Sequence, residues 1–184
     1  QNHRIQIFTE QGDFITKFGE KSKGKKPNNG EFNEPTYLKI DKQGNIYIVD
    51  SLNHRIQVFD KNYNFKFAFG NKGNLAGEFN NPFGIAIDKD EYIYITDKQN
   101  NRIQKFDKNG IFIKEWKEIK VNEDETIKLT HPTGIAIDND LNIYVSDTQN
   151  HRIIKFTQDG KLLLIIDGNN ETKPPSSYGE HPIK

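Results

Sequence analysis

The sequence predicts an all-β fold in which a unit of four antiparallel strands is repeated along the chain. One stretch occurs three times in full: PTYLKIDKQGNIYIVDSLNHRIQVF from Pro35, PFGIAIDKDEYIYITDKQNNRIQKF from Pro82 and PTGIAIDNDLNIYVSDTQNHRIIKF from Pro132. The chain opens on the back half of the same stretch, NHRIQIF, from Asn2. Within the copies apolar residues alternate with a period of two, which is typical of strands. Repetition at this spacing predicts that the copies fold as equivalent units.

Spacing inside the copies is constant, whereas the connection between copies varies. Counted from the initial proline, an aspartate follows after 15 residues, an arginine after 20 and a phenylalanine after 24. The connections span 17, 13 and 16 residues, from Phe18 to Pro35, from Phe69 to Pro82 and from Trp116 to Pro132. Length therefore varies in one loop only, which indicates a rigid scaffold that carries variable loops.

The first strand of each copy follows the proline and alternates large with small side chains. Its large residues are Leu38 and Ile40, Ile85 and Ile87, and Ile135 and Ile137. Ala86 and Ala136 lie between them and indicate a crowded inner edge, to which Lys39 is the exception. A turn of constant length follows, and its fourth place holds Gly44, Glu91 and Leu141. A left-handed backbone at this place would strain the two residues that are not glycine.

The other three strands carry apolar residues on both faces. The second strands read Ile46 to Val49, Ile93 to Ile95 and Ile143 to Val145. The third strands place isoleucine on one face (Ile5, Ile56, Ile103, Ile153) and phenylalanine on the other (Phe8, Phe59, Phe106, Phe156). The last strands run over residues 14–18, 65–69, 112–116 and 162–166. Two apolar faces indicate a sheet that is covered on both sides.

A four-stranded sheet with two apolar faces is not stable alone, so we expect the copies to stack radially as blades of a β-propeller. The sequence then holds about three and a half blades of a six-bladed propeller. The expected boundaries are a half blade in residues 1–19, blades in 35–70, 82–116 and 132–166, and the lead-in to a further blade in 167–184.

The composition argues against several classes of partner and against cysteine chemistry. The 26 basic and 26 acidic residues balance, which predicts no general attraction to nucleic acid or to an anionic membrane. No apolar run is long enough to cross a bilayer, so no membrane contact is expected of this segment. Cysteine is absent, which excludes disulfides and thiolate metal sites.

The residues of the third copy resemble a known repeat. They are Pro132-Thr133-Gly134-Ile135-Ala136-Ile137-Asp138, then Asn142-Ile143-Tyr144-Val145-Ser146-Asp147, then Asn150-His151-Arg152-Ile153. The Asn-His-Arg triplet recurs at Asn2, at Asn53 and, with Asn101 in place of histidine, at Asn100. This pattern is similar to the NHL repeat, and the resemblance covers nearly the whole chain.

The resemblance implies a propeller, most often of six blades, that acts mainly as a binding platform. Family members include RNA- and protein-binding domains of tripartite-motif ubiquitin ligases, sensor domains of bacterial receptor kinases and the peptide-amidating lyase. Six blades need roughly 250 to 300 residues. We therefore expect the further blades to come from the same longer chain.

The aspartate and arginine of each copy look catalytic in isolation, but they recur in every blade. The pairs are Asp50 with Arg55, Asp97 with Arg102 and Asp147 with Arg152. An aspartate that ends one strand and an arginine that begins the next can clamp the hairpin between them. We interpret these residues as structural and predict no catalytic residue among them.

The histidines likewise predict no metal site and no cofactor. His3, His54 and His151 occupy equivalent places on different blades, so they do not converge on one ion. We expect them to serve packing or the hairpin loop. His131 stands apart because it precedes a first strand, but no further ligand accompanies it. The histidines, arginine and tyrosine that the amidating lyase would require are not matched.

Candidate binding residues lie in the variable loops and beside them. Lys23, Lys25 and Lys26 make the first loop basic, and this loop serves either as a solvated linker or as part of a binding rim. Tyr37, Phe83 and Thr133 begin the first strands, where with His131 they either anchor a partner or pack the rim.

The leading hypothesis is a non-enzymatic module that binds a protein or peptide through the loop face. The first alternative is single-stranded RNA, which stacks on aromatic side chains over a basic surface. The second is a lyase that resembles the peptide-amidating enzyme and uses the central channel.

Overall fold

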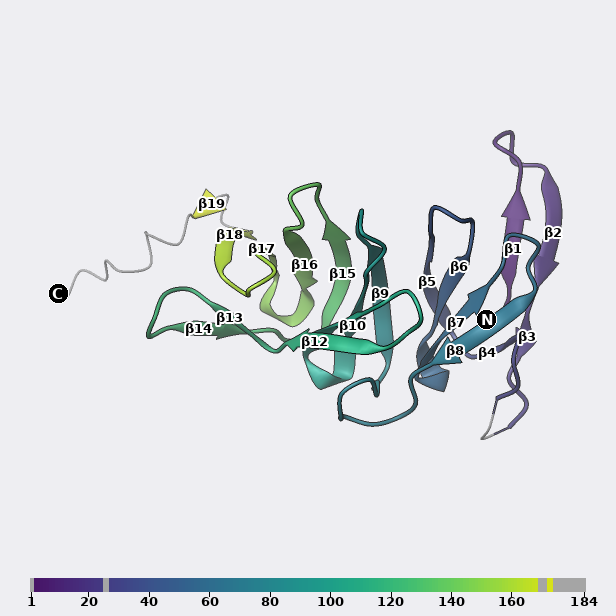
Figure 1. Cartoon of the computed structure of the whole chain (residues 1–184), viewed down its shortest axis with the longest axis horizontal. Coiled ribbons are helices and arrows are strands. Elements are labelled where there is room, and N and C mark those ends of the chain that lie inside the picture. The colour runs from purple at the N-terminus through teal and green to yellow at the C-terminus, as the bar shows by residue number, and fades with distance from the viewer. Residues whose placement is uncertain (1, 25–26, 169–171, 174–184) are drawn as a thin grey trace. The chain divides into compact units, whose positions relative to one another are not determined.

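The computed structural model describes residues 2–24, 27–168 and 172–173, which form strands and three short 3-10 turns (Figure 1). The chain divides into two compact units, residues 1–82 and 83–184, and each is described separately. In the described part, no helix has the length and apolar character needed to span a membrane.

Unit 1 contains a hairpin, a short parallel pair and a four-stranded sheet. The hairpin is β1 (Ile5–Phe8) with β2 (Phe14–Phe18), and the parallel pair is β3 (Glu20–Lys21) with β4 (Glu31–Phe32). The sheet is β5 (Pro35–Ile40), β6 (Ile46–Asp50), β7 (Arg55–Phe59) and β8 (Phe65–Phe69), with η1 (Ser51–Asn53) between β6 and β7. Its neighbouring strands are all antiparallel.

Unit 2 repeats this plan in two antiparallel sheets. The first is β9 (Pro82–Ile87), β10 (Ile93–Asp97), η2 (Lys98–Asn100), β11 (Arg102–Phe106) and β12 (Phe112–Trp116). The second is β15 (Pro132–Ile137), β16 (Ile143–Asp147), η3 (Thr148–Asn150), β17 (Arg152–Phe156), β18 (Leu162–Asp167) and β19 (Thr172–Lys173). A hairpin, β13 (Glu118–Lys120) with β14 (Thr126–Lys128), stands between them in the sequence.

The predicted all-β fold of four-stranded antiparallel sheets is confirmed. The predicted lead-in of residues 167–184 lies mostly outside the described residues. Within it, Asp167 ends β18, and β19 pairs with β18 as a fifth strand.

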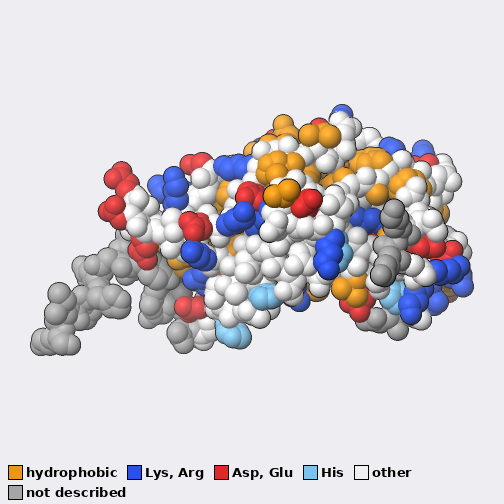
Figure 2. Space-filling model, turned by 90° about the horizontal axis from the view of Figure 1, so that it is seen from below, with side chains coloured by type: hydrophobic (Ala, Val, Ile, Leu, Met, Phe, Trp, Pro, Cys, Tyr) orange, Lys and Arg blue, Asp and Glu red, His pale blue; other side chains and the backbone are white. Residues whose placement is uncertain are grey.

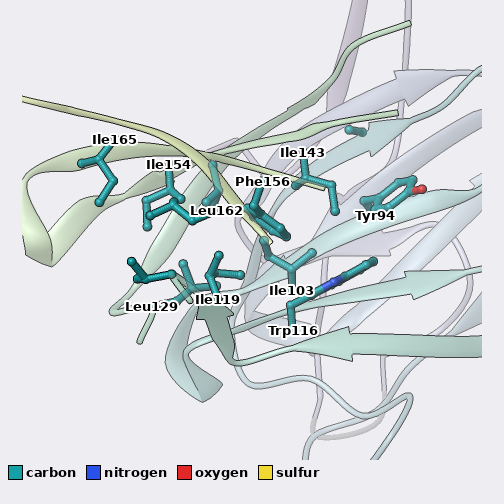
Figure 3. Packing of buried hydrophobic residues seen from close by; sticks show 13 residues of the cluster. Tyr94, Ile103, Trp116, Ile119, Leu129, Ile143, Ile154, Phe156, Leu162 and Ile165 are labelled. Carbon is teal, nitrogen blue, oxygen red and sulfur yellow. The ribbon is translucent and has the colours of Figure 1, made fainter. Parts of the chain in front are cut away.

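The core of unit 2 forms where its two sheets pack face to face. Trp116 of the first sheet packs against Phe156 of the second, with ring centroids 6.1 Å apart, and stacks on Tyr94 at 6.0 Å. Figure 3 shows these side chains pointing toward one another, with Ile119 and Leu129 beside them. Each such side chain contributes about 1.5–3 kcal/mol when it is fully buried, so this interface accounts for much of the stability of the unit.

The first strands of the two sheets approach closely, as their small residues predict. A Cβ atom at Gly84 would collide with the carbonyl oxygen of Thr133. Thr96 Oγ1 accepts a hydrogen bond from the Gly84 amide (2.7 Å) and donates to that carbonyl (2.8 Å). Ala86 is buried, but Ala136 in β15 is exposed, so the crowding applies to β9 and not to β15.

The turn after the first strand is left-handed at its fourth place. Glu91 and Leu141 both have φ of +66°, where Gly44 has +83°. A side chain in this region costs about 1–2 kcal/mol. The aspartate that opens the turn offsets this cost, since Asp138 Oδ1 accepts the amides of Asp140 (3.0 Å) and Asn142 (2.8 Å).

A buried carboxylate closes the second strand of each four-stranded sheet. It accepts the Nε–H of the following arginine at 2.9 Å (Asp50–Arg55), 2.7 Å (Asp97–Arg102) and 2.8 Å (Asp147–Arg152). The side-chain amides of Asn53, Asn100 and Asn150 donate to the same carboxylates. The other oxygen of Asp50 accepts the amide of Asn33 (2.7 Å), and that of Asp147 accepts the amide of Thr130 (2.6 Å). One carboxylate thus holds both the hairpin and the incoming loop.

The middle residue of the Asn-His-Arg triplet forms a second tie, which we call the latch. His3 Nδ1 accepts the amide of Glu34 (3.1 Å), His54 Nδ1 that of Asn81 (3.1 Å) and Asn101 Oδ1 that of His131 (2.8 Å). The three donors each precede a proline, and their φ values are +52°, +51° and +50°. The latch therefore holds a left-handed residue directly before a first strand.

We predict that Asp50→Ala lowers the free energy of unfolding by about 3–5 kcal/mol, because it leaves the buried guanidinium of Arg55 without its carboxylate. Chemical denaturation measures this loss. Asp60→Ala, which removes an exposed turn carboxylate, is the matched control and should cost much less. Equal losses in the two variants would contradict the role of the buried carboxylate.

We also predict that the His54 latch weakens in acid. Burial, followed by the Lys72 ammonium, lowers the pKa of His54 below its usual 6.5, against the opposing effect of the Asp50 carboxylate. The unfolded chain then binds the proton more tightly. The stability that the latch contributes is therefore present above pH 6.5 and is lost as the pH falls through the lowered pKa.

His54→Asn places at this position the residue that forms the latch at Asn101, and it removes the titrating group. Between about pH 7.5 and about pH 5, the free energy of unfolding of the original protein should fall by about 1 kcal/mol more than that of the variant. If the free energy of unfolding changed by the same amount in the two proteins between these pH values, the prediction would be refuted.

Candidate binding site

The variable connections and the 3-10 turns lie at one end of each sheet. The register pairs Pro35 with Asp50 and Pro132 with Asp147, so the start of each first strand lies beside the 3-10 turn. In unit 2 we define the loop face as the residues at this end: Phe83, Lys98, Gln99, His131, Thr133, Thr148 and Gln149.

Side chains on the loop face contact one another in pairs. Lys98 Nζ lies 5.2 Å from the centroid of the Phe83 ring. The hydroxyls of Thr133 and Thr148 are 2.6 Å apart. His131 Nε2 lies 3.3 Å from Gln99 Oε1. These contacts fix the side chains without burying the face, since Gln99, Thr148 and Gln149 are exposed.

The charge of the loop face comes from Lys98, since none of its seven residues is acidic. The nearest carboxylates along the chain, Asp97 and Asp147, are buried against arginine. The rest of the face presents amides, hydroxyls and one aromatic ring. Figure 2 shows acidic and basic side chains interspersed on the surface that it displays.

The backbone and the ring of His131 each contact a neighbouring side chain. Its amide donates to Asn101, and its Nδ1 is buried with no hydrogen-bond partner among the described residues. In the described part of the chain, no group of three histidine, cysteine, aspartate or glutamate residues is placed to hold a metal ion.

The predicted binding residues divide between the two units. Phe83, His131 and Thr133 lie in unit 2, each beside a different residue of its 3-10 turns, whereas Tyr37 and Lys23 belong to unit 1. Tyr37 is 48% exposed on β5. Lys23 donates to Glu20 at 3.0 Å, which raises the pKa of Lys23 and offsets its charge. Lys25 and Lys26 lie outside the described residues.

Sequence analysis missed two features of this end of the molecule. Lys98, Gln99 and Thr148 were overlooked because a 3-10 turn has no periodicity that separates it from a loop. The connection 117–131 was interpreted as a loop, but it contains the hairpin β13–β14, which the alternation of Ile119 with Val121 could have indicated. A hollow of about 650 Å³ lies beside this hairpin, lined by Lys120, Val121, Asn122, Glu123, Asp159 and Lys161.

The opposite end of unit 2 holds a polar cluster that contains a lysine of lowered pKa. Tyr94 donates to Asp88 (2.8 Å) and Lys105 to Gln158 (3.1 Å), and burial lowers the pKa of Lys105. The next sheet repeats the cluster with Asp138, Tyr144 and Lys155. Burial would raise the pKa of Asp138, but hydrogen bonds from Asn142, Lys155 and Tyr144 lower it to about 2. Because the cluster recurs, we assign it to structure.

Comparison with known proteins identifies the repeat. Residues 40–127 match a family described as a 6-bladed beta-propeller, and residues 129–156 match the NHL repeat. "Protein brain tumor" of Drosophila melanogaster is 48% identical over 44 residues, which are 24% of this chain and 4% of that protein. "B-box type zinc finger protein ncl-1" of Caenorhabditis elegans is 53% identical over 38 residues, which are 21% of this chain and 4% of that protein.

Solved structures share the fold at low sequence identity. A streptogramin B lyase structure has a TM-score of 0.63 at 20% identity, over 94% of this chain and 48% of that one. A virginiamycin B lyase from Staphylococcus aureus has a TM-score of 0.59 at 16% identity, over 90% and 49%. The chain thus spans about half the length of these propellers and a small part of the curated relatives. The strands, the Asn-His-Arg triplets and the two family matches together show that the repeats of this chain are similar to those of NHL-repeat β-propellers.

Proposed function

We propose that this chain is a binding module that takes a protein or peptide partner through the loop face. The observation that carries the proposal is that the repeated and the variable residues of the chain have different roles in its sheets. The polar residues that repeat form the aspartate–arginine clamps and the latches, whereas the residues at the loop end, directly after the proline and in the 3-10 turns, differ between copies.

The differing positions are easily identified in the repeat. The residue after the proline is Thr36, Phe83 or Thr133, and the 3-10 turns read Ser51-Leu52, Lys98-Gln99 and Thr148-Gln149. These positions have the same backbone geometry but different side chains. Such variation on a constant scaffold suits recognition of a partner.

The chemistry of the loop face suits a peptide. The amides of Gln99 and Gln149 both donate and accept hydrogen bonds, as peptide groups do. Phe83 supplies an aromatic contact of the kind that dominates protein interfaces. Lys98 adds one cation, which favours a partner that carries an acidic residue nearby.

Single-stranded RNA is the competing partner, since Phe83 and Lys98 are also residue types that bind bases and phosphates. The balanced charge of the chain gives no basic excess in its favour. For a lyase, the support is the likeness in fold to streptogramin B lyase at 20% identity.

Selection of random peptides displayed on phage against immobilised residues 1–184 tests the proposal. We expect enriched peptides whose affinity falls at least about tenfold with Phe83→Ala, and several-fold with Lys98→Ala. Lys108→Ala, in a turn at the opposite end of the sheets, is the matched lysine control and should have no effect.

Two outcomes would overturn the proposal. One is that no peptide is enriched, and the other is that enriched peptides bind the Phe83→Ala variant unchanged. A labelled single-stranded RNA of random sequence serves as the counter-probe. If it bound with a steep salt dependence that Lys98→Ala reduces, RNA would replace the peptide as the partner.

A further inference from the structure

The polar cluster at the end of unit 2 opposite the loop face recurs in both sheets, but the surroundings of its lysine differ. Lys105 in β11 and Lys155 in β17 each follow the initial proline of their copy by 23 residues. Both side chains are partly buried. The same position in unit 1 holds Val58. The two lysines are therefore a matched pair, and a difference in their reactivity reports on their surroundings.

Lys155 is paired with a carboxylate. Its Nζ lies 3.2 Å from Asp138 Oδ2 and 4.8 Å from the centroid of the Tyr144 ring. Hydrogen bonds to Tyr144 and Asp138 raise the pKa of Lys155 above its usual 10.5. These contacts keep the side chain in its ammonium form, which has no free electron pair and is not a nucleophile.

Lys105 forms no such pair in the part of the chain that the structure describes. Its Nζ donates to the uncharged Oε1 of Gln158 at 3.1 Å and lies 4.1 Å and 5.0 Å from the ring centroids of Tyr92 and Tyr94. The aspartate that corresponds to the partner of Lys155 is Asp88, whose Oδ2 accepts the hydroxyl of Tyr94 at 2.8 Å. The amine of Lys105 thus contacts a neutral oxygen and two rings.

A second ammonium lies directly across from Lys105. Lys114 is its register partner on β12, and Lys114 Nζ donates to the backbone carbonyl of Gln158 at 2.9 Å. Two cations therefore converge on one residue, and like charges at opposed positions of a sheet repel. In the next sheet the residue across from Lys155 is Leu164, which carries no charge.

These surroundings favour the neutral amine at Lys105. Burial lowers the pKa of Lys105 below its usual 10.5, the carboxylates of Asp88 and Asp90 oppose this effect, and the ammonium of Lys114 adds to it. At a given pH a larger fraction of Lys105 than of Lys155 therefore holds a free electron pair. A lysine that is desolvated or placed beside another cation is the usual form of an amine that adds to carbonyl groups.

The charge next to Lys105 selects among carbonyl compounds. The Tyr92 ring that contacts Lys105 also lines a hollow of about 230 Å³, whose other lining residues are Asp90, Glu91, Asp107, Lys108 and Asn109. Three carboxylates and one ammonium give this hollow a negative charge, which repels anions. An uncharged carbonyl compound therefore approaches Lys105 more readily than an anionic one.

We propose that Lys105 is a carbonyl-reactive amine that captures small uncharged aldehydes as an imine. The electron pair of Nζ adds to the carbonyl carbon, and the carbonyl oxygen then leaves as water with the two hydrogens of the amine. A C=N bond replaces the C=O bond, so the step needs no oxidant or reductant. This site is separate from the loop face, and the inference does not depend on the proposed partner.

Trapping of the imine tests the proposal. Propionaldehyde is added to residues 1–184 at about pH 7.5 with cyanoborohydride, which reduces an imine to a stable secondary amine. Mass spectrometry of proteolytic peptides then measures the label at each lysine. We expect Lys105 to carry at least about fivefold more label than Lys155. Equal labelling of the two lysines, or more label on Lys155, would overturn the proposal.

Unfolding the protein in denaturant provides the control for local sequence. The contacts of both amines are lost there, so we expect Lys105 and Lys155 to be labelled equally. A preference for Lys105 that persisted in the unfolded chain would show that the folded surroundings do not activate it, and it would overturn the proposal.

Lys114→Leu tests the second cation, because it places at this position the residue type that lies across from Lys155. We expect the label at Lys105 to fall at least about twofold. Lys161→Leu, which removes an exposed lysine after the turn that contains Gln158, is the matched control and should change it little. Unchanged labelling in Lys114→Leu would contradict the role of the paired lysines, and the comparison with Lys155 does not depend on this variant.

Glyoxylate, an aldehyde that carries a carboxylate, tests the selection by charge. The reference is Lys39, an exposed lysine in unit 1. Relative to Lys39, we expect glyoxylate to label Lys105 several-fold less than propionaldehyde does. The same ratio for the two aldehydes would overturn the assignment to uncharged compounds.

Discussion

The buried aspartate at the end of each second strand is the interaction on which the sheets depend. A carboxylate without solvent is costly unless donors surround it. Here the arginine, the asparagine and a loop amide supply those donors, from three segments of the chain. Strand register, hairpin turn and incoming loop must therefore be correct together. This requirement makes each sheet a cooperative unit and explains why the spacing from proline to arginine does not vary.

Strands and clamps follow from the sequence because each leaves a local pattern. The period-two alternation locates the strands, and repetition shows that Asp50 and Arg55 act within the scaffold. The latches are harder to recognise, because His54 and Asn101 are different residue types that accept backbone amides at equivalent positions. Left-handed backbone at Asn81 or His131 is equally hidden, since sequence alone favours glycine there.

The candidate site was predictable only in part. Phe83 and Thr133 could be placed because they follow the proline in a fixed register. Lys98 and Gln99 could not, because a single 3-10 turn has no period that distinguishes it from a loop. The basic character expected of the first loop is reduced at Lys23 by its pairing with Glu20, a contact between neighbours that composition does not reveal.

The latch also has a consequence for how this scaffold diversifies. Glu34, Asn81 and His131 share one backbone conformation although one is acidic, one neutral and one an imidazole. Since a neighbouring side chain fixes that conformation through the amide, the identity of the residue itself is left unconstrained. Substitutions at this position change the chemistry of the rim without moving the strand that follows. A repeat built in this way can change the side chain at one residue per sheet while the strand that follows keeps its place.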